Sequence, residues 1–145
     1  MRRYDAILLS LLIPLGLSAC GGDDRLSEEE FVEKANAICA EGNEELDRVA
    51  DELAGGGEQP SDEDLQEFVD TAVANIGGQL DEIEELSPPE DMEADVEDLL
   101  ETGRSELADL EDAGVDALQS GENPFVESNA KAGDLGLTEC AAEGT

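Results

Sequence analysis

Three cysteines carry most of the reactive side-chain chemistry in this chain of 145 residues. Cys20 follows an apolar N-terminal stretch, whereas Cys39 and Cys140 lie far apart in the acidic remainder. A cysteine sulfur can be alkylated, oxidised to a disulfide or bound to a metal. The chain contains no His, so it lacks the usual general base and the commonest metal ligand. The sequence therefore favours acylation and disulfide formation over metal binding, and we expect neither a metal nor a cofactor.

The segment before Cys20 has the arrangement of a secretory leader. Arg2 and Arg3 precede an apolar run over residues 6–17, and small residues follow it. This order is typical of a signal peptide. The run is shorter than the roughly 20 apolar residues that a membrane-spanning helix needs. The sequence therefore predicts export, with residues 1–19 as the leader.

The end of this leader resembles the lipobox of bacterial lipoproteins. Leu17, Ser18, Ala19 and Cys20 match its pattern of an aliphatic residue, two small residues and a cysteine. The resemblance implies that a diacylglyceryl group is transferred to the Cys20 thiol and that the chain is cut just before it. Residues 1–19 would then be a lipoprotein signal peptide. The alternative is an ordinary secretory cut after Ala19, which would leave Cys20 as a free thiol.

A short segment would then separate the lipid from the folded domain. Residues 20–26 contain Gly21 and Gly22 and are predicted to form a lipid-anchored flexible tether. Two acyl chains meet the two-signal requirement for stable membrane attachment. We therefore expect the protein at the cell membrane, on its extracytoplasmic face, with residues 27–145 forming one domain.

Acidic residues dominate the composition. The chain holds 40 Asp and Glu against 7 Lys and Arg, which gives a formal net charge of −33. Such a chain repels nucleic acid phosphates, so nucleic acid is excluded as a partner. Anionic lipid head groups repel it too, so the lipid alone would hold the domain at the membrane. High charge with few aromatic residues also occurs in disordered chains, but a regular apolar periodicity favours a folded domain here.

That periodicity predicts helices. Apolar residues recur at steps of three or four over residues 31–53, 65–83 and 92–118, which is the spacing of one helix face. A short fourth helix is predicted to begin at Asn123 and Pro124. Capping boxes are predicted at the start of the three long helices, in the pairs Ser27 with Glu30, Ser61 with Asp64, and Ser87 with Glu90. The expected fold is all-α, an antiparallel bundle of three long helices plus a short fourth.

The same pattern suggests roles for the bulkiest and the smallest residues. Phe31, Phe68 and Phe125 lie in or beside the apolar stripes, so we expect all three in the core. Gly77 and Gly78 lie inside the second helix. They are compatible with a hinge, but close packing against a neighbour or a simple kink is the favoured interpretation.

With Cys20 assigned to lipid, Cys39 and Cys140 remain as a pair. An even number of cysteines in an exported protein predicts a structural disulfide, because the surroundings are oxidising. In an up-down-up-down bundle the fourth helix would lie beside the first and bring Cys140 near the level of Cys39. The bond would close a loop of about 100 residues. Free or redox-active thiols are the alternative.

Three short motifs resemble those of small acidic lipoproteins of high-GC Gram-positive bacteria, a group without an assigned activity. The resemblance covers most of the chain after Cys20 and implies the same location and the same disulfide. The motifs are Asn36-Ala37-Ile38-Cys39, Leu86-Ser87-Pro88-Pro89-Glu90-Asp91 and Gly136-Leu137-Thr138-Glu139-Cys140.

One motif with catalytic potential is present. Ser128 and Lys131 have the S-x-x-K spacing in which a lysine activates a serine nucleophile. The companion S-D-N and K-T-G elements of those enzymes are missing, and Lys131 is better placed to pair with Glu127 one helical turn earlier. We therefore expect that the protein is not an enzyme.

The remaining candidate groups are carboxylates. Glu93, Glu97 and Glu101 stack at helical spacing, as do Glu41 and Glu45. Oxygen ligands suit divalent cations, but a solvated acidic face is the favoured interpretation.

The sequence as a whole predicts a lipid-anchored, extracytoplasmic lipoprotein that acts without catalysis. Its domain would serve in interaction with an envelope protein or as a structural component of the envelope. The alternative is a binding lipoprotein that captures divalent cations or basic peptides on its acidic surface.

Overall fold

The computed structural model describes residues 25–55 and 59–141, and every regular element within these ranges is a helix. This confirms the predicted all-α class for the described part of the chain. The helices are α1 (Glu28–Gly55), α2 (Asp62–Glu85), α3 (Glu93–Ala113), α4 (Val115–Ser120) and α5 (Val126–Asp134).

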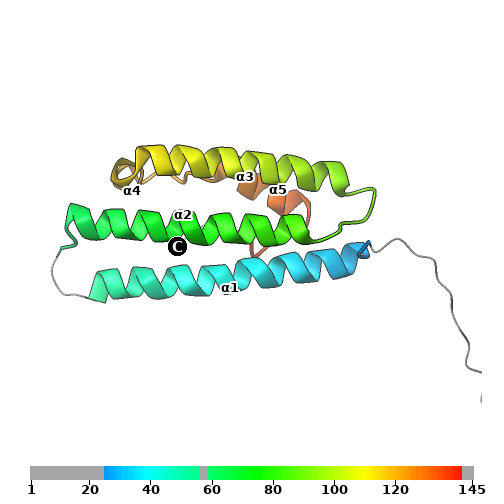
Figure 1. Cartoon of the computed structure of the whole chain (residues 1–145), viewed down its shortest axis with the longest axis horizontal. Helices are drawn as coiled ribbons and strands as arrows, with labels where there is room; N and C mark the ends of the chain where they lie inside the picture. Colours follow the sequence, from blue (N-terminus) through cyan, green and yellow to red (C-terminus); the bar gives the residue numbers. More distant parts are fainter. Residues whose placement is uncertain (1–24, 56–58, 142–145) are drawn as a thin grey trace, which may run out of the picture.

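The three long helices lie side by side in one row (Figure 1). α1 packs against α2 and α2 against α3, and each runs antiparallel to its neighbour. α5 packs against α3 on one side of this row. α4 contacts α2 and α3 at the end of the row opposite the α2–α3 corner. The predicted antiparallel arrangement of three long helices is thereby confirmed.

Two of the three predicted capping boxes are present. The Glu30 amide donates to Ser27 Oγ at 3.3 Å, and the Ser27 amide donates to Glu30 Oε2 at 3.0 Å. Ser61 and Asp64 form the same reciprocal pair at the start of α2. Hydrogen bonds from each serine, first from its hydroxyl, lower the pKa of the carboxyl that accepts them. This contribution to stability is present above the ordinary carboxyl pKa and is lost as the pH falls through the lowered one.

The third predicted capping box, Ser87 with Glu90, is wrong. α3 begins at Glu93, and its N-cap residue Met92 makes no side-chain cap hydrogen bond. Residues 87–89 are not helical. The α conformation is disfavoured for a residue that precedes proline, and here two consecutive prolines impose this on two successive residues. The helix therefore starts only after the proline pair.

The non-helical corner instead holds the chain that enters α1. The Leu26 amide donates to the Ser87 carbonyl oxygen at 2.8 Å. The Arg25 guanidinium donates to the Pro88 carbonyl oxygen at 3.1 Å and to Glu93 Oε2 at 3.0 Å. The start of α1 is thus fixed against the α2–α3 corner.

Two predicted helix boundaries after α3 are also corrected. The predicted helix over 92–118 is interrupted at Gly114, whose φ of 56° and ψ of −133° lie in a region that is essentially restricted to glycine. The predicted short fourth helix corresponds to α5, which begins at Val126 and not at Asn123. Asn123 Oδ1 accepts a hydrogen bond from the Phe125 amide at 2.8 Å in the turn before it.

The densest core lies where the first part of α1 meets the end of α2 and the start of α3. Phe31 and Leu137 are fully buried there, and Ile83 and Val96 are nearly so. The core cluster comprises Phe31, Ala35, Cys39, Ile83, Met92, Val96, Leu99, Leu100, Ala132 and Leu137. It joins all of the packed elements except α4.

Leu137 reaches this core through the turn that ends α5. Gly136 has a left-handed φ of 76°, and the Leu137 amide donates to the Ala132 carbonyl oxygen at 2.9 Å. The Gly136 amide donates to the Gly133 carbonyl oxygen at 3.1 Å. This pair of bonds defines a Schellman motif, which brings the residue after the left-handed glycine into contact with the helix's last turn. Ala132 and Leu137, the two residues so paired, are both buried.

The position of the short fourth element differs from the expectation. α5 packs against α3 and not beside α1. The segment after it, residues 135–141, crosses to α1 and covers the side of the core where the fourth helix was expected.

A second correction concerns the phenylalanines. Phe31 is in the core as predicted, but Phe68 and Phe125 are only half-buried and lie outside the core cluster.

Candidate functional site

The predicted lipidation site lies outside the described residues. Leu17, Ser18, Ala19 and Cys20 all precede residue 25, as does most of the predicted tether. Among the helices of residues 25–55 and 59–141, none has the length and apolar character that crossing a membrane requires. The lipid anchor therefore stays a prediction from sequence.

Cys39 and Cys140 form a disulfide, as predicted, with their Cα atoms 5.0 Å apart and a sequence separation of 101 residues. Cys39 is 3 % exposed in the middle of α1. Cys140 lies on the segment after α5, and its Sγ is 3.6 Å from the Ala35 carbonyl oxygen. The bond therefore joins the terminal segment directly to the core.

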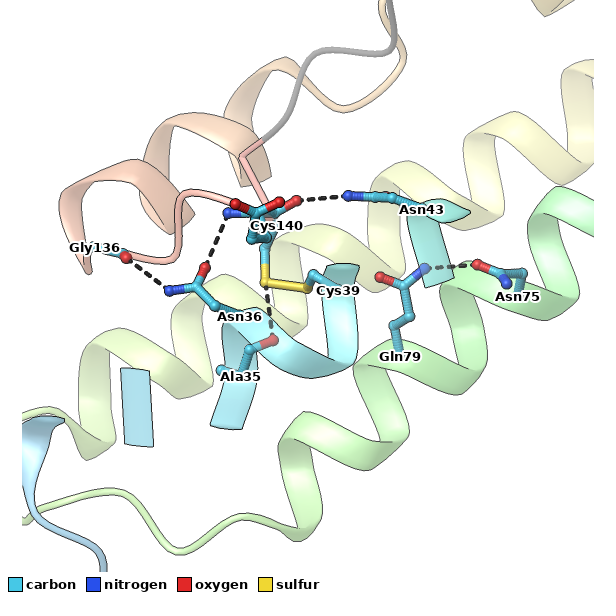
Figure 2. The surroundings of a disulfide bond; sticks show 9 residues. Ala35, Asn36, Cys39, Asn43, Asn75, Gln79, Gly136 and Cys140 are labelled. Atoms are coloured by element: carbon cyan, nitrogen blue, oxygen red, sulfur yellow. Dashed lines mark hydrogen bonds between the residues drawn. A yellow bond between two sulfur atoms is a disulfide. The ribbon is translucent and has the colours of Figure 1, made fainter. Parts of the chain in front are cut away.

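Two asparagines of α1 hold the same segment on either side of the disulfide (Figure 2). Asn36 Nδ2 donates to the Gly136 carbonyl oxygen at 3.2 Å, and Asn36 Oδ1 accepts from the Glu139 amide at 2.9 Å. Asn43 Nδ2 donates to the Glu139 carbonyl oxygen at 2.8 Å. Because Asn36, Cys39 and Asn43 follow each other at steps of three and four, they share one helix face. These contacts supply hydrogen-bond partners within the protein to backbone groups of a non-helical segment.

The S-x-x-K pair lies on α5, and its lysine has other partners. The Lys131 ammonium binds the Asp98 carboxylate and lies 3.7 Å from Glu127 Oε1, the predicted partner. The Asp98 hydrogen bond raises the pKa of Lys131, whereas a general base needs a lowered one. Ser128 is buried, and its Oγ is 3.5 Å from the Phe125 carbonyl oxygen. This arrangement favours a structural role for both residues.

The stacked glutamates of α3 line a charged hollow of about 840 Å³ between α3 and the end of α2. Glu93, Glu97 and Glu101 share its lining with two arginines. Arg25 pairs with Glu93 at 3.0 Å, and Arg104 pairs with Asp81 and Glu84 at 3.0 and 2.7 Å. Within residues 25–55 and 59–141, no group of three or more Cys, Asp or Glu side chains is arranged to hold a metal ion.

The second stack of glutamates, Glu41 and Glu45, lies on α1, and Glu45 takes part in an ion pair. Glu45 binds Arg48 at 2.5 Å, and Arg48 also binds Glu52 at 2.6 Å. The hydrogen bonds from Arg48 lower the pKa of Glu45. All three side chains are largely exposed, where such ion pairs contribute little to stability. Glu41, the other member of the stack, is exposed as well.

A second hollow, hereafter the groove, has a volume of about 620 Å³ and a chiefly apolar lining. It begins at the disulfide and runs along α1 and α2 toward α4 and the loop over residues 121–125. All five helices contribute to its lining. Characteristic lining residues are Leu46, Phe68, Ile76, Ala117, Leu118 and Phe125. The two phenylalanines that are absent from the core are thus accounted for by the groove.

The side chain of Gln79 lines the groove between α1 and α2. Gln79 Nε2 donates to Asn75 Oδ1 at 2.6 Å (Figure 2). A Cβ built on Gly42 would lie 2.1 Å from Gln79 Nε2, so a side chain at position 42 requires this amide to move. The small residue in the α1 stripe therefore makes room for a polar side chain in a chiefly apolar hollow.

Sequence reasoning identified the disulfide but not the asparagine contacts or the groove. Asn36 belongs to one of the quoted motifs, yet nothing in its local pattern indicates a partner 100 residues away. The groove had one available signal, which is the predicted length of the fourth helix. A helix much shorter than its three neighbours covers only part of their apolar faces.

Comparison of this chain with models of protein families, with curated proteins and with solved structures yields no match.

Proposed function

We propose that this protein is a lipid-anchored extracytoplasmic lipoprotein whose helical domain acts by binding and not by catalysis. The disulfide between Cys39 and Cys140 carries the proposal, because disulfides form and persist in oxidising compartments. The apolar leader accounts for export to such a compartment. Acylation of Cys20 would then hold the domain at the membrane surface.

A binding role is supported by the way the reactive side chains are engaged. Lys131 is paired with carboxylates and its pKa is raised, which disfavours proton abstraction from Ser128. The cysteines after Cys20 are oxidised to each other and so are withdrawn from nucleophilic chemistry. An envelope protein is the proposed partner of the acidic, membrane-attached domain.

Mass spectrometry of the protein purified from its own membranes tests the anchor. We expect a chain that begins at an acylated Cys20, lacks residues 1–19 and exposes two new thiols only after reduction. A Cys20→Ser variant is the control and should leave the membrane fraction. An unprocessed, unacylated chain in which Cys39 and Cys140 react with alkylating reagents before reduction would refute the proposal.

Cross-linking in intact envelopes tests the partner. After residue 20 the chain has only Lys34 and Lys131, so an amine-reactive reagent has few targets. A carbodiimide-activated reagent that couples carboxylates is the better choice, since all but one of the 40 Asp and Glu residues follow residue 20. A discrete product that persists at rising salt supports a specific partner. Loss of every product at moderate salt would indicate nonspecific charge attraction.

A second candidate function is the capture of divalent cations or basic peptides on the acidic surface. The observation in its favour is the hollow that Glu93, Glu97 and Glu101 line together. Calorimetric titration with Ca²⁺, Mg²⁺ or polylysine tests it, because a saturable site must exceed the heat of charge screening alone.

A further inference from the structure

The groove stands out from the rest of this molecule because its lining is nearly free of charge. The chain has 40 acidic residues, yet Glu122 is the only charged one among the described residues that line the groove. Glu122 itself is exposed. The polar lining residues are otherwise neutral, and Asn43, Gln79 and Asn129 are among them. One concave, chiefly apolar part of a highly acidic surface therefore carries almost no charge.

We propose that the groove binds one uncharged, chiefly apolar small molecule. Its volume of about 620 Å³ falls within the roughly 300–1,000 Å³ of small-molecule sites, which are mostly apolar with a few polar groups. Phe68 and Phe125 offer aromatic surface to an apolar body, and the amides of Gln79 and Asn129 offer contacts to a neutral polar group.

The charges on the protein define the class of ligand. A net charge of −33 repels anions at long range, so a fatty acid or a phosphate ester is disfavoured. A cation is attracted to the protein, but the only charged partner that the described lining of the groove gives it is Glu122, which is exposed. Burying a charge without a partner is costly. Uncharged molecules incur neither penalty.

The size of the groove favours a compact ligand over a second protein chain. The disulfide lies at one end of its lining, and α4 with the loop over residues 121–125 lies at the other. A helix has a diameter of about 10–12 Å with its side chains, which is large for a hollow of about 620 Å³. A second copy of this chain would also bring its own charge of −33 against the first.

A pair of fluorescent dyes that differ by one sulfonate tests the proposal. N-phenyl-1-naphthylamine is neutral, and 8-anilinonaphthalene-1-sulfonate has the same aromatic body with a negative charge. The protein to use is residues 20–145 with Cys20→Ser and the disulfide formed, because the described fold lies wholly within residues 25–141. We expect saturable binding of one neutral dye per chain and at least about tenfold weaker binding of the sulfonate at low salt. Added salt should narrow this difference by screening.

Two matched alanine substitutions locate the site. Ala117 lines the groove, whereas Ala130 is exposed on α5 and is not part of the lining. Ala117→Phe should fill part of the groove and weaken binding of the neutral dye about tenfold, whereas Ala130→Phe should leave it unchanged. Thermal unfolding of both variants shows whether each is folded.

Several outcomes would overturn the proposal. They are equal affinity for the two dyes, equal effects of Ala117→Phe and Ala130→Phe, binding that does not saturate, and a doubling of the protein's mass in light scattering that Ala117→Phe abolishes, which would indicate a second copy in the groove. The protein used has no lipid, so these results do not depend on the anchor. Failure of the groove proposal and failure of the lipoprotein proposal are therefore distinguishable.

Discussion

The two ends of the helix row use similar apolar stripes and reach different degrees of burial. At one end, the disulfide half (residues 28–39, 80–100 and 132–141), Phe31 and Leu137 are fully buried. At the other, the groove half (residues 43–55, 62–79 and 107–125), Val69 and Leu110 are buried but Phe68 and Phe125 are only half-buried, and Leu118 is 38 % exposed.

The difference lies in what covers the row. Residues 132–141 close the disulfide half and contribute Leu137 and Cys140 to it. The groove half has only α4 and a loop at its end. An apolar stripe thus makes a helix amphipathic, but it becomes a core only where another element covers it. We expect stability to be concentrated in the disulfide half and binding in the groove half.

Removal of the disulfide should produce the largest change. The Cys39–Cys140 bond closes a separation of 101 residues, for which the chain-entropy description gives about 4–5 kcal/mol of stabilisation. Urea unfolding of the oxidised protein, of the reduced protein and of a Cys39→Ser, Cys140→Ser double variant measures this. The reduced protein and the double variant should agree with each other. An unchanged urea midpoint after reduction would show that packing alone holds residues 132–141 in place.

Equal truncations in the two halves should have unequal costs. Phe31→Ala removes a fully buried ring and should cost about 3–5 kcal/mol. Phe68→Ala removes a half-buried ring and should cost about half of that or less, because part of the ring is already in water. Urea unfolding of both variants checks the ratio.

Phe31→Leu is a milder variant for the case that Phe31→Ala does not fold. The comparison between the halves fails if Phe68→Ala destabilises the protein as much as Phe31→Ala. The groove would then behave as core.

Three glycines should respond with opposite signs to the same substitution. Gly136 has a φ of 76°, so Gly136→Ala should cost about 1–2 kcal/mol. Gly77 and Gly78 lie in the continuous helix α2. A Cβ at Gly77 would lie 3.6 Å from Leu107 Cδ2, which is ordinary contact, and one at Gly78 meets nothing within 4 Å.

Gly77→Ala and Gly78→Ala should therefore each stabilise the protein by about 0.5–1 kcal/mol through helix propensity. Thermal unfolding measures all three changes. Destabilisation by alanine at position 77 or 78 would contradict this expectation and would favour the close packing against a neighbour that the sequence analysis preferred to a hinge.

Salt should have the smallest effect and should act on both halves. Like charges along the helices repel one another, at a cost of some tenths of a kcal/mol for each close pair, and added salt screens this repulsion. We expect the melting temperature to rise with NaCl. CaCl₂ at the same ionic strength is the matched comparison. An additional, saturable rise with Ca²⁺ would favour the cation-binding function, and a melting temperature independent of ionic strength would contradict the screening argument.

Local sequence signals predicted those features that depend on neighbouring residues. Ser27 with Glu30 and Ser61 with Asp64 are reciprocal caps that need only one helical turn, and both are present. The prediction failed at Ser87, where the proline pair overrides the cap. It also failed at Gly114. This residue adopts a backbone conformation that is essentially restricted to glycine, and the helix ends there although the apolar stripe continues.

The disulfide could be predicted although its route could not. The number of cysteines and the leader were sufficient to pair Cys39 with Cys140. That α5 lies on α3, and that residues 135–141 rather than a helix reach α1, depends on a Schellman turn and on the contacts of Asn36 and Asn43. These are interactions across about 100 residues of sequence, which local patterns do not encode.

The sequence by itself determined the acidity, the helices with their apolar faces and the cysteines available for pairing, because composition, helical period and residue count are local properties. Only the tertiary structure decided which parts of those faces become core and which become groove. α5 has 9 residues and α2 has 24, which at 1.5 Å per residue are about 14 Å and about 36 Å. A helix as short as α5 covers only one half of the row. Where α5 lies depends on how segments that are distant in the sequence pack.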